Sequence, residues 1–276
     1  MDYCSDEEQT LRDAIIVKEV RLIRTKMPRI GTRKLHFMLT TTLQKHGISL
    51  GRDRLFVLLD KYELLVHRRK RRRTHTTDSN HPFRKYPNLI KELEIFRPDQ
   101  LWVSDITYLS LSDRFCYLSL VTDAYSRKIV GYCLYPTLQK EGSLNAINMA
   151  LQGLPSVEKN VLIHHSDRGL QYCCGAYISL LEQKNISISM TENGDPYENA
   201  LAERVNGILK DEFLLDRDFD NFEQAKMIVK EAINTYNLLR PHASCNYLTP
   251  QQAHKQHGLL PMKWTKKKKK AEVLEA

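Results

Sequence analysis

Three carboxylates constrain the fold of this chain most, because each lies where an unpaired acid is hard to explain by structure alone. Asp105 interrupts the strand-like run 101–108, where an ionised side chain is costly unless a cation compensates it. Asp167 follows a second apolar run, 161–165, so we expect it at the end of another strand, where loops carry active-site groups. Glu203 lies in a stretch with helical composition. Two strands and a helix that each offer one acid predict an α/β fold with a divalent-metal site.

The spacing of the acids is a second constraint. The 35 residues numbered 168–202 separate Asp167 from Glu203, and Lys210 follows Glu203 by seven positions, two helical turns on the same face. The pattern closely resembles the DDE transposases of the IS3 family of insertion sequences, relatives of retroviral integrase. It is carried by the segments WVSDITYLS, HHSDRGLQY, SMTENGDPYENALAERVNGILKDEF, YNLLRPH and LTPQQA. The resemblance covers roughly residues 30–255.

This resemblance implies that Asp105, Asp167 and Glu203 are both the catalytic residues and the metal ligands. Hard cations prefer oxygen ligands, so two Mg²⁺ or Mn²⁺ ions per active site are expected, with room for phosphate oxygens and water. One ion would activate water or a DNA 3′-hydroxyl, and the other would stabilise the leaving 3′-oxygen. The family joins a freed 3′-hydroxyl at one element end to the other end, and the circular intermediate later integrates. Lys210 resembles the lysine with which the family contacts DNA.

The N-terminal part of the chain has the pattern of a small helical domain. Helices are expected at 7–26 and 32–45, and a third helix begins at Arg52. That helix has apolar residues at i, i+3, i+4 and i+7, which define one buried stripe: Leu55, Leu58, Leu59 and Tyr62. Residues 1–66 are therefore predicted to form an all-α helix-turn-helix domain, with Arg52 and Arg54 on the opposite face. The resemblance to the family's N-terminal helix-turn-helix implies that this domain binds DNA and that these arginines face it. An ordinary three-helix core is the alternative.

The central part has the order of an RNase H-like α/β fold, in which antiparallel strands are followed by strand-helix alternation. Residues 99–215 are predicted to form an integrase-type catalytic core, a mixed five-stranded sheet flanked by helices. Its expected elements are strands at 101–109, 114–122, 128–135, 160–165 and 186–190, and helices at 139–152, 175–184 and 197–213. Residues 216–276 are assigned C-terminal helices and a basic tail, with one helix at 221–239 and another capped by Thr249-Pro250.

Positive charge indicates a polyanionic partner. The chain has 42 Lys and Arg against 33 Asp and Glu, a formal net charge of +9. Much of the excess is in the tail, 266–270, and in the linker expected at 67–98, where the predicted phosphate contacts are Arg68, Arg69, Lys70, Arg71, Arg72 and Arg73. A solvated linker and tail is the alternative. Beside a nuclease-like acid cluster, the blocks favour DNA.

Several other polar residues have ordinary structural explanations. Asp113 and Asp123 lie in expected turns, where aspartate bonds its own backbone. His164 and His165 are expected to be hydrogen-bonded, as histidines at strand ends usually are, and a place near the metals is the alternative. Solvent exposure is expected for three acids on or near the helix of Glu203, namely Glu198, Asp211 and Glu212. Residues matching the family pattern around the acids, and expected to brace the site, are Gln171, Tyr172, Tyr197 and Asn199.

The cysteines and the lack of targeting signals bear on compartment. The six cysteines are scattered, and neither a secretory signal nor an apolar run of transmembrane length is present. We expect a cytoplasmic protein with reduced thiols, associated with the nucleoid of a prokaryote. His254 and His257 have metal-pair spacing but no CxxC follows, so a zinc domain is not expected.

The sequence thus predicts a transposase that cleaves and joins DNA at the ends of an insertion sequence. The resemblance implies terminal inverted repeats and target DNA as substrates, assembly as a homo-oligomer on DNA, and a frameshift fusion to an upstream reading-frame protein. Two alternatives keep part of the pattern: an RNase H-like structure-selective nuclease, and a catalytically silent DNA-binding regulator. The presence of all three acids argues against the silent regulator.

Overall fold

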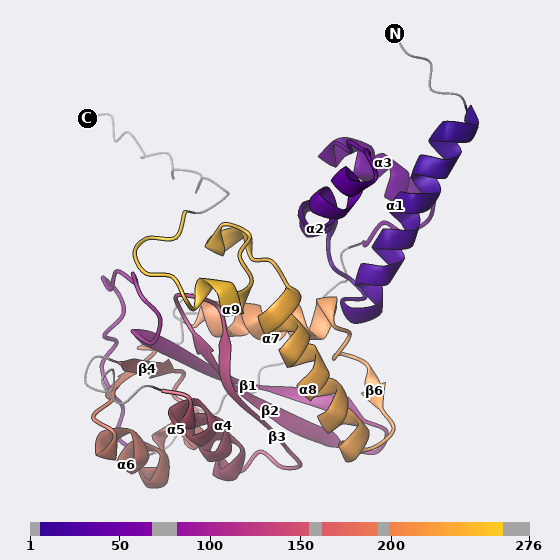
Figure 1. Cartoon of the computed structure of the whole chain (residues 1–276). Coiled ribbons are helices and arrows are strands. Elements are labelled where there is room, and N and C mark those ends of the chain that lie inside the picture. Colours follow the sequence, from indigo (N-terminus) through magenta and orange to yellow (C-terminus); the bar gives the residue numbers. More distant parts are fainter. Residues whose placement is uncertain (1–5, 68–81, 155–161, 193–198, 262–276) are drawn as a thin grey trace, which may run out of the picture.

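The computed structural model describes residues 6–67, 82–154, 162–192 and 199–261 (Figure 1). The linker residues Arg68 to Arg73, the lysine tail, Tyr197 and Glu198 lie outside these described residues. Figure 1 places the N-terminal helices above one end of a larger body that contains the sheet. None of the helices within the described ranges has the length and apolar character needed to cross a bilayer.

The N-terminal helices have the bounds that the sequence predicts. They are α1 (Asp6–Lys26), α2 (Thr32–Lys45) and α3 (Arg52–Lys61). Leu55, Leu58 and Leu59 of α3 are buried, and they form the stripe against which α1 and α2 pack. The turn after α2 uses Gly47 at φ 68°, a left-handed conformation that glycine adopts without a steric cost.

The core sheet is mixed, as predicted, and has the spatial order β3-β2-β1-β4-β5. Neighbours β1–β2 and β2–β3 are antiparallel, whereas β1–β4 and β4–β5 are parallel. A short strand, β6, pairs with the far end of β1 and was not predicted, because two residues carry no readable periodicity. The strands are β1 (Leu101–Leu111), β2 (Phe115–Asp123), β3 (Ile129–Tyr135), β4 (Ile163–Ser166), β5 (Ser187–Met190) and β6 (Asp218–Phe219).

Helices cover both faces of the sheet, and the alternation along each strand decides which side chain meets which layer. Trp102 and Val121 pack with one helical layer, and Leu118 and Leu120 pack with the other. The first layer consists of α4 (Lys140–Gln152), α5 (Leu170–Cys173) and α6 (Gly175–Gln183), and the second contains α7 (Ala200–Glu212) and α8 (Phe222–Leu239). The four-residue α5 was not predicted.

The chain after α8 packs back onto the core. Asn237 brackets Ile129 of β3, accepting from its N–H at 3.0 Å and donating to its carbonyl oxygen at 2.9 Å. A short helix, α9 (Pro250–Ala253), then begins at Thr249 with a complete capping box, as the Thr249-Pro250 signal predicts. The end of α8 and the following residues therefore form part of the catalytic body's surface.

Gly131 allows α4 to approach β3 closely, so we expect Gly131→Ala to destabilise the protein strongly. A Cβ at this position would lie 2.1 Å from the carbonyl oxygen of Ala146 and 2.9 Å from the Ala150 nitrogen, both backbone atoms. The helix must then move, and the expected loss is about 3 kcal/mol of unfolding free energy. Urea denaturation measures this loss. The matched control is Gly175→Ala, where nothing lies within 4 Å, and equal effects of the two substitutions would contradict the explanation.

Candidate active site

The fold brings the three predicted acids toward one place. Asp105 lies in the middle of β1, and Asp167 directly follows β4. These strands pair in parallel with Val103 opposite His165, so the same register continued by two residues places Asp167 level with Asp105. Glu203 lies in the first turn of α7. The site is therefore built from two adjacent strands and one helix that crosses β1.

Two asparagines fasten α7 to β1 beside the acids. Asn199, the residue before α7, donates its side-chain amide to the Ser104 carbonyl oxygen at 3.2 Å. Asn206, one turn after Glu203, donates to Asp105 Oδ2 at 2.8 Å. Both asparagines are buried, and the Oδ1 atom of each has no hydrogen-bond partner. Their amide groups couple the helix that carries Glu203 to the strand that carries Asp105.

Electrostatics show that negative charge accumulates at Asp105. Its pKa is raised from 3.8 to about 7, first by burial and then by the charge of Asp167, with a smaller contribution from Glu203. Hydrogen bonds from Asn206 and from the Ile106 N–H act in the opposite direction. Asp167 Oδ1 accepts the Gly169 N–H at 3.0 Å, which fixes its orientation. Burial and the neighbouring carboxylates therefore make the ionised form of Asp105 costly.

The histidines behind the acids are structural, as expected. His164 Nε2 lies 2.8 Å from Ser104 Oγ and 2.9 Å from the Tyr177 hydroxyl oxygen, and His165 Nδ1 lies 2.8 Å from Ser189 Oγ. Burial lowers the pKa of His164 from 6.5 to about 3, so the imidazole is neutral at physiological pH. The hydrogen bonds of His164 hold β4 against β1 and α6.

This buried neutral histidine predicts a pH dependence of stability. Below pH 6.5 the unfolded chain protonates His164 and the folded protein does not, so stability falls as pH falls, by about 1.4 kcal/mol per pH unit. His242, whose pKa burial also depresses strongly, adds a second such slope. Asp105 has the opposite sign, because its raised pKa makes the folded state bind a proton between about 7 and 3.8. Adding the two histidine contributions and subtracting that of Asp105 leaves a net slope close to that of one histidine.

We therefore expect unfolding free energy without divalent cations to fall by about 1.4 kcal/mol per unit between pH 6 and 5. Glutamine at position 164 has no titrating group, so His164→Gln should be nearly flat over this window. Urea denaturation at several pH values makes the measurement. Parallel slopes for wild type and His164→Gln would show that His164 does not remain neutral in the folded state.

A second group of acidic and histidine side chains lies near the start of β1 and the end of β2. Among the described residues, one set of three His, Cys, Asp or Glu side chains has its ligand atoms all within 4.8 Å of one another: Asp99, Asp123 and His254. The ligand atoms of Asp105, Asp167 and Glu203 are not all within that distance of one another. Asp123 Oδ1 accepts the Ser126 N–H and hydroxyl, and its Oδ2 accepts the Asp99 N–H. This group caps the turn after β2 and docks α9 through His254. The turn role expected for Asp123 is confirmed.

Lys210 lies on the active-site side of α7, as its spacing from Glu203 suggested. Its Nζ lies 4.0 Å from the centre of the Tyr108 ring on β1, a cation–π contact. Burial lowers the pKa of Lys210, and the charge of Asp105 counteracts that shift. On α3, Arg54 is exposed, and Arg52 is exposed and pairs with Asp53 at 2.8 Å.

Two residues near the site were missed or misjudged from sequence. Glu212, expected to be solvated, is 12% exposed and accepts hydrogen bonds from Lys34 and Arg240, so that expectation is wrong. Asn206 was not singled out, although its position one turn after Glu203 places it beside the acids. Among the expected bracing residues, Tyr172 is buried, and its pKa is raised first by burial and to a smaller extent by Asp105 and Asp167. Gln171 is half-buried and donates to the Leu138 carbonyl oxygen at 2.8 Å.

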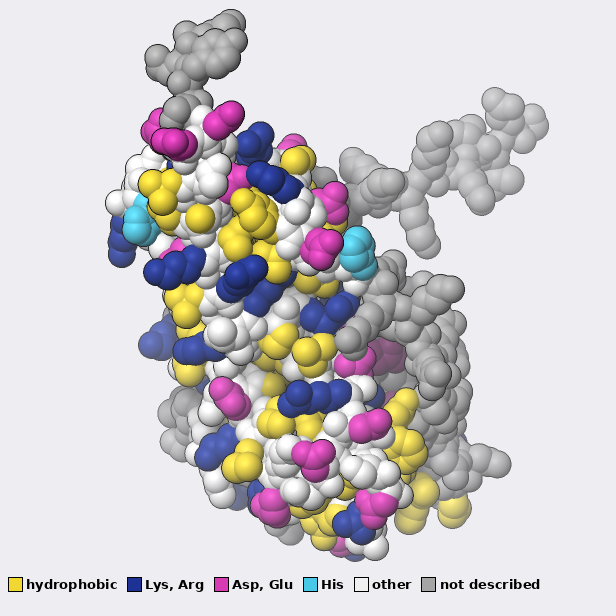
Figure 2. Space-filling model, turned by 90° about the vertical axis from the view of Figure 1, so that its right-hand side faces the viewer, with side chains coloured by type: hydrophobic (Ala, Val, Ile, Leu, Met, Phe, Trp, Pro, Cys, Tyr) yellow, Lys and Arg dark blue, Asp and Glu magenta, His cyan; other side chains and the backbone are white. Residues whose placement is uncertain are grey.

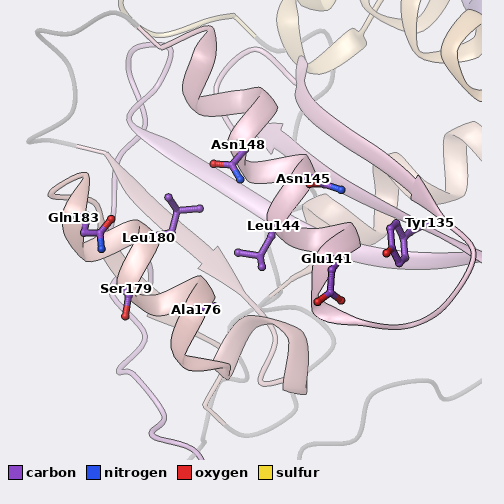
Figure 3. A pocket seen from close by; sticks show the side chains of 9 residues that line it. All are labelled: Tyr135, Glu141, Leu144, Asn145, Asn148, Ala176, Ser179, Leu180 and Gln183. Atoms are coloured by element: carbon purple, nitrogen blue, oxygen red, sulfur yellow. The ribbon is translucent and has the colours of Figure 1, made fainter.

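The molecule has a surface cleft apart from the predicted triad. A surface cleft of about 600 Å³ lies between α4 and α6, and its lining includes Glu141, Asn145 and Asn148 from α4 and Ser179 and Gln183 from α6 (Figure 3). None of the three acids lines it. An acid cluster that does not line this cleft fits a long polymeric substrate better than a small enclosed one.

Comparison with known proteins agrees with this geometry. The integrase core domain family matches residues 96–196 and 184–250. The chain is 36% identical over 248 residues to the insertion element IS600 uncharacterized 31 kDa protein of Shigella sonnei, across 89% of this chain and 88% of that protein. It is 35% identical over 156 residues to transposase InsF of insertion sequence IS3A from Escherichia coli K12, across 56% and 54%.

A solved structure shows the same fold. The simian T-cell lymphotropic virus intasome, determined with the PP2A regulatory subunit B56 gamma, aligns with a TM-score of 0.51 and 20% identity, over 86% of this chain and 78% of that one. The RNase H-like core expected from the sequence is thereby confirmed. Sequence and fold agree, and the chain belongs to the IS3-type family of DDE transposases.

Proposed function

We propose that this chain is a transposase catalytic subunit whose active site is Asp105, Asp167 and Glu203. It cleaves DNA at the ends of an insertion sequence and transfers the freed strands. The observation that carries the proposal is the convergence of the three acids from β1, the end of β4 and α7, within a chain of this family. The raised pKa of Asp105, caused by burial and by the other two acids, supports their proximity.

The donor set fits divalent metal ions. All three side chains offer carboxylate oxygens, which Mg²⁺ and Mn²⁺ prefer. A cation would offset both the burial and the repulsion that raise the pKa of Asp105. When bound, two such ions would supply Lewis-acid activation of the attacking oxygen and stabilisation of the leaving 3′-oxygen. Asp105, Asp167 and Glu203 would hold them. Glu203 is exposed, so its side chain has the freedom to complete the set.

The chain's other residues orient these groups and the DNA. Asn206 fixes one oxygen of Asp105, and the Gly169 N–H fixes one oxygen of Asp167. Lys210 cannot ligate a cation, so its ammonium would bind a phosphate or base of the DNA end near the scissile bond. Water or a DNA 3′-hydroxyl is the nucleophile in this mechanism. No covalent protein–DNA intermediate forms.

Double-stranded DNA is the substrate, as terminal inverted repeats and as target. The helical domain would read the element ends through Arg52 and Arg54 of α3, and Arg68 to Arg73 would add sequence-independent phosphate contacts. Figure 2 shows Lys and Arg side chains over the helical domain on one face, and its exposed basic residues include Arg12, Lys18, Arg21, Lys26 and Arg33. Homo-oligomeric assembly on DNA, fusion to an upstream-frame protein and a cytoplasmic, nucleoid-associated location complete the proposal.

A cleavage assay tests the function directly. A labelled linear DNA carrying one end of the element is incubated with the full chain and Mg²⁺ or Mn²⁺. We expect a strand cut at the element boundary that leaves a 3′-hydroxyl and needs the cation. Binding of the end without any cut, under either ion, would favour a silent regulator, and cutting that depends on DNA structure and ignores the terminal sequence would favour a nuclease.

Metal binding can be measured without activity, and it should separate Asp105 from other acids. Mg²⁺ at ten times its dissociation constant should stabilise the wild type by about 1.4 kcal/mol. Asp105→Asn should lose this response, and without metal at pH 8 it should be more stable than wild type because the repelled carboxylate is gone. Thermal denaturation at matched ionic strength makes the comparison. Asp113→Asn, an exposed turn acid, is the control, and an equal loss of response there would contradict a specific site.

A further inference from the structure

The last turn of α7 is where the helical domain is fastened to the catalytic body. Glu212 accepts a hydrogen bond from Lys34 Nζ of α2 at 3.0 Å. The same carboxylate accepts two bonds from Arg240, after α8, each 2.8 Å long. Figure 1 shows this end of α7 beside the lower end of α1. Three segments far apart in sequence therefore meet at one carboxylate.

Two further contacts hold the same junction. The Arg29 N–H donates to the Glu212 carbonyl oxygen at 3.0 Å, and Arg29 Nε donates to Asp211 Oδ1 at 3.2 Å. Phe37, in the second turn of α2, stacks on Tyr247, with ring centroids 4.7 Å apart and an angle of 14° between the ring planes. The helical domain is thus attached to the body by backbone, ionic and aromatic contacts.

Charge balance does not require Lys34 at this position. Burial alone would raise the pKa of Glu212, but Arg240 and Lys34 hold it at about 2. Arg240, 2% exposed, already forms a bidentate pair with the carboxylate, the strong geometry for such bonds. Lys34 is partly desolvated, and burial together with the charge of Arg240 lowers its pKa. Because Arg240 already neutralises the Glu212 carboxylate, we infer that the desolvated Lys34 has a role other than neutralising it.

The role of Lys34 is explained by the other residues of α7, the helix to which it binds. Glu203 precedes Glu212 by nine residues, about 14 Å along the α7 axis, and Lys210 precedes it by two. A helix of 13 residues moves as a unit, so any shift of its last turn is passed to Glu203. Misplacement of a reacting group by about 1 Å can reduce a rate by roughly 100-fold.

We propose that Glu212 is a positioning residue, which through Lys34 fixes α7 to the helical domain and so aligns Glu203 and Lys210 with DNA that this domain holds. The proposal rests on the function proposed above. It differs from a purely stabilising role, because it predicts slower chemistry in protein that is fully folded and binds DNA normally.

The test compares two substitutions at position 34 in the full chain. Lys34→Arg keeps the charge, and Lys34→Met keeps the aliphatic stem without it. The control is Lys230→Met, which removes an exposed lysine of α8 in the catalytic body. Single-turnover cleavage of a labelled element end is followed at saturating protein, at a temperature where circular dichroism shows every variant folded. DNA affinity is measured separately by fluorescence anisotropy. Hydrogen exchange of the amides in the last turn of α7 reports the junction without DNA.

We expect Lys34→Met to cleave at least about 10-fold more slowly, with DNA affinity within about twofold of wild type. Its α7 amides should exchange faster, while Lys34→Arg and Lys230→Met should match the wild type in rate and exchange. A normal rate for Lys34→Met, a rate and affinity that decline together, or unchanged exchange would each overturn the positioning role. Absence of cleavage by the wild type would instead refute the proposed function itself.

Discussion

Asp105→Asn, Asp167→Asn and Glu203→Gln should each abolish strand cleavage and strand transfer while leaving binding to the element ends largely intact. Each substitution removes a charge from the proposed metal site and keeps the side chain's size. A bound metal ion stabilises the charge of the transition state by several kcal/mol, and losing that stabilisation corresponds to a rate reduction of about 10³-fold or more. Cleavage of a labelled end with Mg²⁺ measures the rate, and gel shift measures the binding.

The control for these three variants is an acid of the same type outside the cluster. Asp113→Asn changes an exposed turn residue between β1 and β2 and should cleave at the wild-type rate. Near-normal activity in any one of the three triad variants would remove that residue from the active site. A parallel loss of end binding would mean that the acid supports the fold or the DNA surface rather than the chemistry.

Arg240→Met should produce the largest loss of stability. The guanidinium is 2% exposed, and it donates to Glu212 through two bonds and lies 2.7 Å from His242 Nε2. Methionine leaves the buried carboxylate with Lys34 alone. Breaking a buried pair by removing one partner costs about 3–5 kcal/mol, which urea denaturation should register.

A double variant separates the effect of losing Arg240 from the effect of leaving the Glu212 carboxylate without its arginine partner. Arg240→Met with Glu212→Met removes both charges, so the loss should be smaller than for Arg240→Met alone. Arg204→Met, at an exposed position of α7, should change stability by less than about 0.5 kcal/mol. If the double variant is less stable than the single one, the pair itself, and not the unpaired charge, dominates the energetics.

The elements of this fold were readable from sequence where periodicity and end signals agreed. The predicted bounds of α2 match the structure, and Thr249-Pro250 predicted the start of α9 through its cap. The strands that carry or flank the acids were also placed within a few residues. In each case the information is local, because a turn of helix or a few alternating residues contains the whole signal.

The junction at Glu212 was not readable, because its partners are distant in the chain. Lys34 lies 178 residues away and Arg240 lies 28 away, so a glutamate at the end of a helix looks like any solvated acid. Asn206 presents the same problem on a smaller scale, since its bond to Asp105 spans 101 residues. Sequence pattern indicated which acids could be catalytic. Only the packing of α7 on β1 identifies the residue that orients one of them.

The two histidines of β4 have a consequence for the fidelity of folding. His164 reaches Ser104 and Tyr177, while the next residue, His165, points to the opposite face and reaches Ser189 on β5. If β4 slipped by one residue, each histidine would point to the other face of the sheet, and both imidazoles would lose these hydrogen bonds. The same slip would turn Asp167 away from Asp105. The strand has four residues, too few for backbone bonding alone to select one alignment reliably. The hydrogen bonds of the two adjacent histidines therefore favour the alignment in which Asp167 lies level with Asp105, and a misaligned β4 would lose them.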